Sequence, residues 1–182
     1  DAAASRLRAV AFRAGAAARL GHHHLLEAGE VRGLLWLPAQ GLAGAEGEIV
    51  LPLAALQLDE PAWRREAGGE FDEKPLSDED RAATRRNLLR SLQAERHPEL
   101  RLRLLHLVGA APWWAAELQL TLAGRSSRHR IGLQVQSTAE RLQVDGRLLL
   151  RHSDHGLTPF SILGGLLAVA DDILIDAKLA WR

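Results

Sequence analysis

Apolar and polar residues alternate repeatedly in the C-terminal part of the chain, from Leu118 to Arg182. A period of two places one face of a β-strand in an apolar environment and the other in water. The apolar members fall into successive groups between turns: Leu118, Leu120 and Leu122; Ile131, Leu133 and Val135; Leu142 and Val144; Leu148 and Leu150; and Ile173, Ile175, Ala177, Leu179 and Trp181. Several such strands at short spacing predict an antiparallel barrel or sandwich. A barrel of about eight strands can enclose one small apolar ligand.

The N-terminal part of the chain shows the same alternation less regularly. We expect strands over residues 5–12, 31–37 and 49–58, the last with a bulge at Ala54-Ala55, and a further strand at 100–104. Residues 59–97 interrupt the pattern as a long loop and helix insertion. Residues 59–77 are rich in charge and glycine, and a helix is predicted to begin at Ser77, with Asp80 in the capping-box position.

The size and charge of the chain narrow the classes of function. At 182 residues it is predicted to be a single domain, residues 1–182, that needs neither a disulfide nor a metal to fold. Lys plus Arg and Asp plus Glu both number 23, which does not favour a nucleic-acid partner. The absence of cysteine excludes thiol chemistry, and no apolar run reaches the roughly 18 residues of a membrane span. The start at Asp1-Ala-Ala-Ala would suit residues left beside a removed export signal.

Five short motifs follow one another over nearly the whole chain. They are His24 followed by Val31-Arg32-Gly33, Asn87–Ser91 with His97–Leu100, Leu120–Gly124, Arg151–Gly156 and Ala170–Ile173. In this order they resemble the YceI-like family, the polyisoprenoid-binding proteins with a lipocalin-like barrel. Two positions depart from the family pattern, since Ala123 stands where the family has histidine and His155 where it has phenylalanine. The ends of the barrel are therefore expected to differ chemically from those of the family.

The resemblance implies a mainly β fold, an antiparallel eight-stranded lipocalin-like barrel with one or two short helices. It also implies a periplasmic or otherwise exported protein that binds a polyisoprenoid or a quinone tail in the barrel and carries or sequesters it. The candidates for the ligand lining are Leu35, Leu37, Leu102, Leu104, Leu118, Leu120, Ile131, Leu133, Leu148, Leu150 and Trp113. The alternation leaves open which face of each strand points inward.

Consecutive histidines at positions 22–24 suggest a second function. On an extended backbone His22 and His24 would project to the same side, about 6–7 Å apart. With His155 or His152 as a third ligand, they would suit zinc or copper at the barrel mouth of a periplasmic metal-binding protein. The competing interpretation is that these histidines lie in turns and bond to backbone carbonyls.

No catalytic set emerges from the sequence. Ser126 and Ser127 precede His129 closely, and residues 153–155 read Ser-Asp-His, but triad members meet from separated chain positions. No Gly-x-Ser-x-Gly motif is present. We therefore predict a protein that is not an enzyme and requires no cofactor, whose partner is a hydrophobic small molecule. The oligomeric state stays open, with a dimer as one option.

Overall fold

The structure is a computed structural model that describes residues 1, 4–39 and 41–181, and within these residues strands form most of the regular structure. The strands are β1 (Arg6–Ala14), β2 (His24–Ala28), β3 (Arg32–Trp36), β4 (Glu46–Pro52), β5 (Leu56–Leu58), β6 (Glu99–Ala110), β7 (Trp113–Leu122), β8 (Arg125–Ser137), β9 (Leu142–Arg151), β10 (Ser161–Ile162) and β11 (Leu167–Trp181). The helices are α1 (Pro61–Ala67) and α2 (Asp78–Ser91), with 3₁₀ turns η2 (Ala18–Leu20), η3 (Leu53–Ala55), η4 (Gly69–Phe71), η5 (Ser153–His155) and η6 (Leu163–Gly165).

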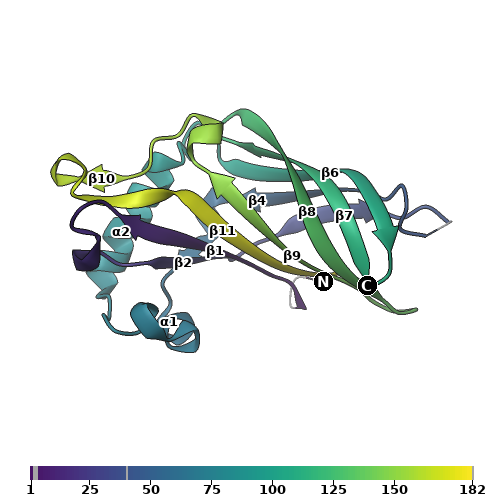
Figure 1. Cartoon of the computed structure of the whole chain (residues 1–182), viewed down its shortest axis with the longest axis horizontal. Helices are drawn as coiled ribbons and strands as arrows, with labels where there is room; N and C mark the ends of the chain where they lie inside the picture. Colours follow the sequence, from purple (N-terminus) through teal and green to yellow (C-terminus); the bar gives the residue numbers. More distant parts are fainter. Residues whose placement is uncertain (2–3, 40, 182) are drawn as a thin grey trace.

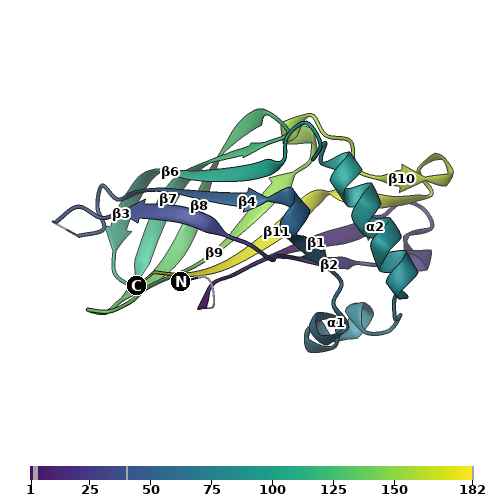
Figure 2. The ribbon, with the colours of Figure 1, turned by 180° about the vertical axis from the view of Figure 1, so that it is seen from behind.

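The strands form one antiparallel sheet that curls into a half-barrel (Figures 1 and 2). Its order is β3-β4-β6-β7-β8-β9-β11-β1-β2-β5, and β10 pairs with β11. The strands at the two ends of this order are close in the chain, because β2 leads into β3 after three residues and β4 leads into β5 through η3. The prediction of a mainly β, antiparallel, barrel-like fold with one or two helices is confirmed, since the described residues contain two α-helices.

The expected count of eight strands is not confirmed, because the sheet of the described residues has eleven. The bulge expected at Ala54-Ala55 is instead the 3₁₀ turn Leu53–Ala55, which divides residues 49–58 between β4 and β5. Strand β2 occupies His24–Ala28, where the alternation predicted none, and β10 has only two residues. The period of two thus predicts that strands form, but it does not locate the breaks between them.

Strand β7 shows how the sequence pattern becomes a wall of the half-barrel. Its second half places Leu118, Leu120 and Leu122 in the interior, whereas Gln119 and Thr121 stay partly exposed. Leu120 pairs with Leu102 of β6, and this register brings the apolar faces of neighbouring strands onto the same side of the sheet.

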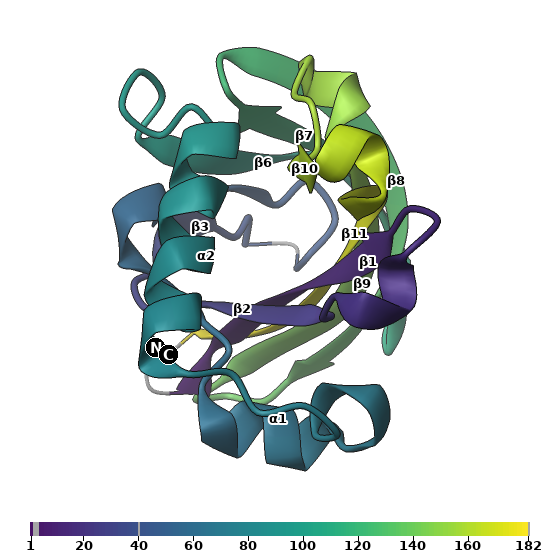
Figure 3. The same ribbon diagram turned by 90° about the vertical axis from the view of Figure 1, so that its left-hand side faces the viewer.

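Residues 59–97 contain α1, η4 and α2, and α2 lies across one end of the curled sheet (Figure 3). The helix begins where the sequence predicts, since the Ser77 hydroxyl accepts a hydrogen bond of 3.1 Å from the backbone N–H of Asp80. Leu88 and Leu92 of α2 pack against the interior of the sheet. Among the described residues, none of the helices has the length and apolar character needed to cross a membrane.

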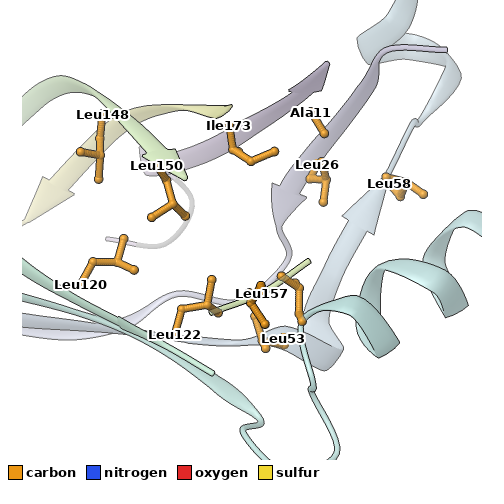
Figure 4. Close-up of a cluster of buried hydrophobic side chains, with 11 residues drawn as sticks. Ala11, Leu26, Leu53, Leu58, Leu120, Leu122, Leu148, Leu150, Leu157 and Ile173 are labelled. Carbon is orange, nitrogen blue, oxygen red and sulfur yellow. The ribbon is translucent and has the colours of Figure 1, made fainter. Parts of the chain in front are cut away.

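Buried leucines line the interior beneath α2. Leu148 and Leu150 of β9 and Ile173 of β11 point across the interior toward Leu120 and Leu122 of β7 (Figure 4). Because the two sets come from opposite walls, the size of the space between them decides what the interior can hold.

Candidate ligand-binding site

Two adjoining cavities occupy the interior of the half-barrel. The first, here called the barrel cavity, has a volume of about 140 Å³ and lies toward β3 and β4. The second, the helix cavity, has a volume of about 190 Å³ and lies beneath α2. Both are lined by Leu7, Leu51, Leu100 and Ile175, so these four side chains mark the boundary between them.

Most of the lining residues predicted from the sequence lie at these cavities. Those at the barrel cavity are Leu35, Leu102, Leu104, Leu118, Leu120, Ile131, Leu133 and Leu148, and Leu150 lies at the helix cavity. They come together because the ladders from β6 to β9 keep the apolar faces of consecutive strands in register.

Leu37 and Trp113 do not lie at either cavity, so the structure corrects both predictions. Leu37 follows the end of β3 and is 46% exposed, and Trp113 begins β7 and is 66% exposed. Successive side chains of a strand point to opposite faces, and it is Trp114 that packs against the buried cluster to which Leu107 and Leu118 belong. The sequence could not separate the two tryptophans because both are apolar.

Several cavity-lining positions were not predicted from the sequence, above all those on the inner face of α2. Thr84, Asn87 and Ser91 line the helix cavity, together with Leu88 and Leu92. Their spacing of three and four residues places them on one face of a helix. This spacing could have assigned the three residues to one helix face from the sequence, but nothing in the sequence indicates what that face covers.

A buried carboxylate holds His24 at the edge of the helix cavity. Asp59 is fully buried and accepts hydrogen bonds from the Leu25 backbone N–H at 2.9 Å, from Arg64 Nη1 at 2.9 Å and from His24 Nδ1 at 2.6 Å. Burial raises the pKa of Asp59, but the hydrogen bond and the electrostatic attraction of His24, the hydrogen bond from Leu25 and the charge of Arg64 outweigh burial and hold the pKa below its ordinary value. The carboxylate is therefore ionised, and the sequence analysis did not single it out.

His152 occupies a second polar position on the same cavity. Its side chain is mostly buried, and its Nδ1 lies 3.0 Å from the backbone carbonyl oxygen of Asp171. The sequence analysis considered His152 as a metal ligand, whereas the structure places it among the apolar walls of the helix cavity.

The histidines of the predicted metal site do not converge. The rings of His22 and His24 lie 6.4 Å apart between centroids, but His155 is bound elsewhere, to the Arg125 carbonyl oxygen and to the Ser127 hydroxyl, each at 3.0 Å. Across residues 1, 4–39 and 41–181, no three histidine, aspartate or glutamate side chains are grouped as a metal site would require. The metal-binding alternative is therefore not supported.

Ser127 lies between two imidazoles, with its Oγ 2.7 Å from His129 Nε2 and 3.0 Å from His155 Nε2. None of these three residues lines either interior cavity. The cluster connects β8 with η5, and it is not positioned to act on a molecule inside the half-barrel.

No family model matches the sequence, and no curated protein matches it either. Among solved structures, BcnA of Burkholderia cenocepacia is similar with a TM-score of 0.69 and 14% identity, over 100% of this chain and 99% of BcnA. The YceI protein of Campylobacter jejuni has a TM-score of 0.58 and 12% identity, over 86% of this chain and 82% of that protein. A mutant YceI protein gives a TM-score of 0.60 at 10% identity, over 86% and 82% of the two chains. The similarity inferred from the sequence motifs is thus confirmed in three dimensions, and this chain has the fold of the YceI proteins.

Proposed function

We propose that this protein binds a long-chain isoprenoid lipid, a polyisoprenoid or a quinone tail, inside the half-barrel and so carries or sequesters it. The observation that supports this proposal most directly is the pair of adjoining cavities with walls of leucine and isoleucine. The fold shared with YceI proteins is consistent with a binder of apolar molecules. An exported location, which the family resemblance implies, is part of the same proposal.

The cavity volumes set a requirement on the bound chain. A cavity of about 150 Å³ lined by apolar side chains takes up a molecule such as benzene, and the barrel cavity is of that order at about 140 Å³. Drug-sized ligands occupy about 300–1,000 Å³. A long chain therefore needs both cavities and some outward movement of their walls. Each methylene group removed from water contributes about 0.8 kcal/mol, which favours a ligand that fills both.

We further propose that binding involves no chemical conversion of the ligand. The side chains that line the barrel cavity are almost entirely aliphatic. Ser127, which contacts two histidines, lies outside both cavities. In this proposal burial of apolar surface drives binding, and no catalytic group or cofactor is required.

Native mass spectrometry of the protein purified with its own membrane fraction tests the proposal. Leu148 lines the barrel cavity, whereas its neighbour Leu149 points outward and is 61% exposed. Leu148→Trp should fill the cavity and abolish the mass of a co-purifying lipid, and Leu149→Trp should leave that mass unchanged. Wild-type protein that carries no lipid and takes up no added isoprenoid would refute the proposal.

A further inference from the structure

Four large apolar side chains are exposed at the end of the molecule where α2 lies. Leu20 of η2 and Leu163 of η6 are each 68% exposed, and Ile162 and Leu166 on either side of η6 are exposed as well. The hairpin of β10 and β11 that carries three of them projects from this end (Figures 1 and 3). We call these four residues the apolar tip. A contiguous exposed apolar patch, unlike single exposed leucines, marks a site of interaction.

Backbone contacts hold the two parts of the apolar tip together. The Ala17 N–H donates a hydrogen bond of 2.9 Å to the carbonyl oxygen of Leu166. Gly15 has a φ of +93°, and a Cβ atom there would lie 2.4 Å from the same oxygen, so glycine is required for this close approach. The turn η2, which carries Leu20, therefore lies against the start of β11.

The backbone of Leu163 adopts a conformation that leucine disfavours. Its φ of +54° lies in the left-handed region, where bulky residues other than glycine are rare. Among the described residues, Leu163 belongs to none of the buried clusters and lines neither interior cavity. The core therefore does not account for a leucine at this strained position, which indicates that its exposed side chain serves binding.

The base of the same hairpin forms part of the wall of the helix cavity. Phe160 and Val169 line that cavity, and the Val169 N–H donates a hydrogen bond of 2.9 Å to the Phe160 carbonyl oxygen. The next pairs of the hairpin are Ser161 with Ala168 and Ile162 with Leu167. The hairpin is thus largely apolar from the cavity wall to its exposed end.

Cationic side chains accompany the apolar tip. Residues 13–21 and 157–170, which build the tip, contain two arginines and neither aspartate nor glutamate. Of these arginines, Arg19 is exposed and forms no ion pair with any residue that the structure describes. In the second half of α2, Arg86 and Arg90 are also exposed and have no acidic partner in the described part of the chain, whereas the acidic residues of α2 lie in its first turn. This end of the molecule therefore suits an anionic partner.

We propose that the apolar tip docks on the surface of an anionic lipid bilayer, so that Ile162, Leu163 and Leu166 enter the interface and Arg19 meets lipid phosphates. The bilayer interface takes up apolar side chains and attracts cations beside them. A protein-binding patch is typically enriched in aromatic residues and methionine, whereas the apolar tip contains only leucine and isoleucine. This choice of partner rests on the proposed function, because a carrier must meet the membrane that holds its lipid.

Sedimentation with vesicles tests the docking in the absence of any isoprenoid. Wild type should bind vesicles of phosphatidylcholine and phosphatidylglycerol in equal parts, and bind phosphatidylcholine vesicles more weakly. Leu163→Asn, which suits the left-handed backbone, should weaken binding about tenfold. Arg19→Ser should weaken it about fivefold on the anionic vesicles alone. The matched control is Leu149→Asn, at a similarly exposed position on β9, and it should bind like wild type.

The absence of cysteine from the chain permits labelling at a single site. Leu163→Cys and Leu149→Cys would each carry the polarity-sensitive dye acrylodan, and only the dye at position 163 should shift its emission to the blue on anionic vesicles. No binding of wild type, or equal emission shifts at the two positions, would overturn the inference. A soluble dimer that Leu163→Asn dissociates, without vesicle binding, would also overturn it and assign the apolar tip to a second copy of the chain.

Uptake of an isoprenoid added from ethanol, read by native mass spectrometry, separates this inference from the proposed function. Protein that binds vesicles but takes up no isoprenoid would refute the proposed function and leave the docking intact. Protein that takes up the isoprenoid but binds no vesicles would refute the docking alone.

Discussion

Asp59→Asn exchanges the buried carboxylate beside the helix cavity for an amide of nearly the same shape. Oδ1 of Asp59 accepts from Leu25 and from Arg64, and an asparagine carbonyl can keep both bonds. Oδ2 lies 2.6 Å from His24 Nδ1. An asparagine NH₂ group in its place is a hydrogen-bond donor and would face the Nδ1–H group, which is also a donor. We therefore expect the His24 proton to move from Nδ1 to Nε2.

The variant also leaves the Arg64 charge without its counter-ion. Arg64 is only 4% exposed, and removing one partner of a buried ion pair costs about 3–5 kcal/mol. The matched control is Asp176→Asn, because Asp176 pairs at 2.8 Å with Arg147, whose side chain is 76% exposed. An exposed pair contributes about 0–1 kcal/mol. The two substitutions should thus differ several-fold in their effect on the free energy of unfolding.

Urea unfolding measures the two free energies, and ¹⁵N NMR of the imidazole nitrogens identifies which nitrogen of His24 carries the proton. Asp59→Asn should lower the urea midpoint far more than Asp176→Asn and should show a protonated Nε2. The reasoning is refuted if Asp59→Asn unfolds at the wild-type urea concentration, or if Nδ1 keeps the proton.

Three further predictions concern stability. The pKa of Asp59 is lowered in the folded state, so its stabilising contribution is complete above the unfolded carboxyl pKa of about 3.9 and is lost as the pH falls through the folded pKa. Urea unfolding between pH 7 and pH 2 should therefore show a steeper loss of stability for wild type than for Asp59→Asn. Parallel curves for the two proteins would contradict this. Leu120→Ala should lower the free energy of unfolding by about 2–5 kcal/mol because Leu120 is 1% exposed, whereas Leu149→Ala, at an outward position, should change it by no more than about 0.5 kcal/mol. Similar losses in the two variants would disprove the assigned strand faces. Ser77→Ala should destabilise α2 by about 1 kcal/mol and speed amide hydrogen exchange in its first turns, because it removes the N-cap. Ser77→Asp should preserve the cap. Equal exchange rates in the two variants would argue against the cap.

The strands that build the barrel cavity were predictable because their signal is local. In β7 each inward leucine is separated from the next by one more polar residue, and this pattern alone assigns Leu118 and Leu120 to the same face. The pattern fails where neighbours are equally apolar, as at Trp113 and Trp114. It also fails at η3, where a 3₁₀ turn separates β4 from β5 although the residues on both sides keep the apolar pattern.

The polar end of the site was less predictable because it depends on contacts between distant parts of the chain. Asp59 acquires its role only when α1 brings Arg64 against it and β2 supplies the Leu25 N–H. His155 was assigned to the mouth with His22 and His24, but the end of β9 places it beside β8, where Ser127 and the Arg125 carbonyl take both ring nitrogens. The spacing of residues along one strand carries no information about contacts with residues far away in the chain.

The four side chains shared by both cavities have a consequence for how affinity depends on ligand length. Leu7, Leu51, Leu100 and Ile175 lie between the two cavities, so a ligand must pass them once it outgrows one cavity. Short homologues then gain affinity with each added carbon until that cavity is full. We expect the next carbons to gain little, because the four shared side chains must move aside to admit them, and the gain should resume in the second cavity. Affinity plotted against carbon number should therefore rise in two stages with a plateau between them.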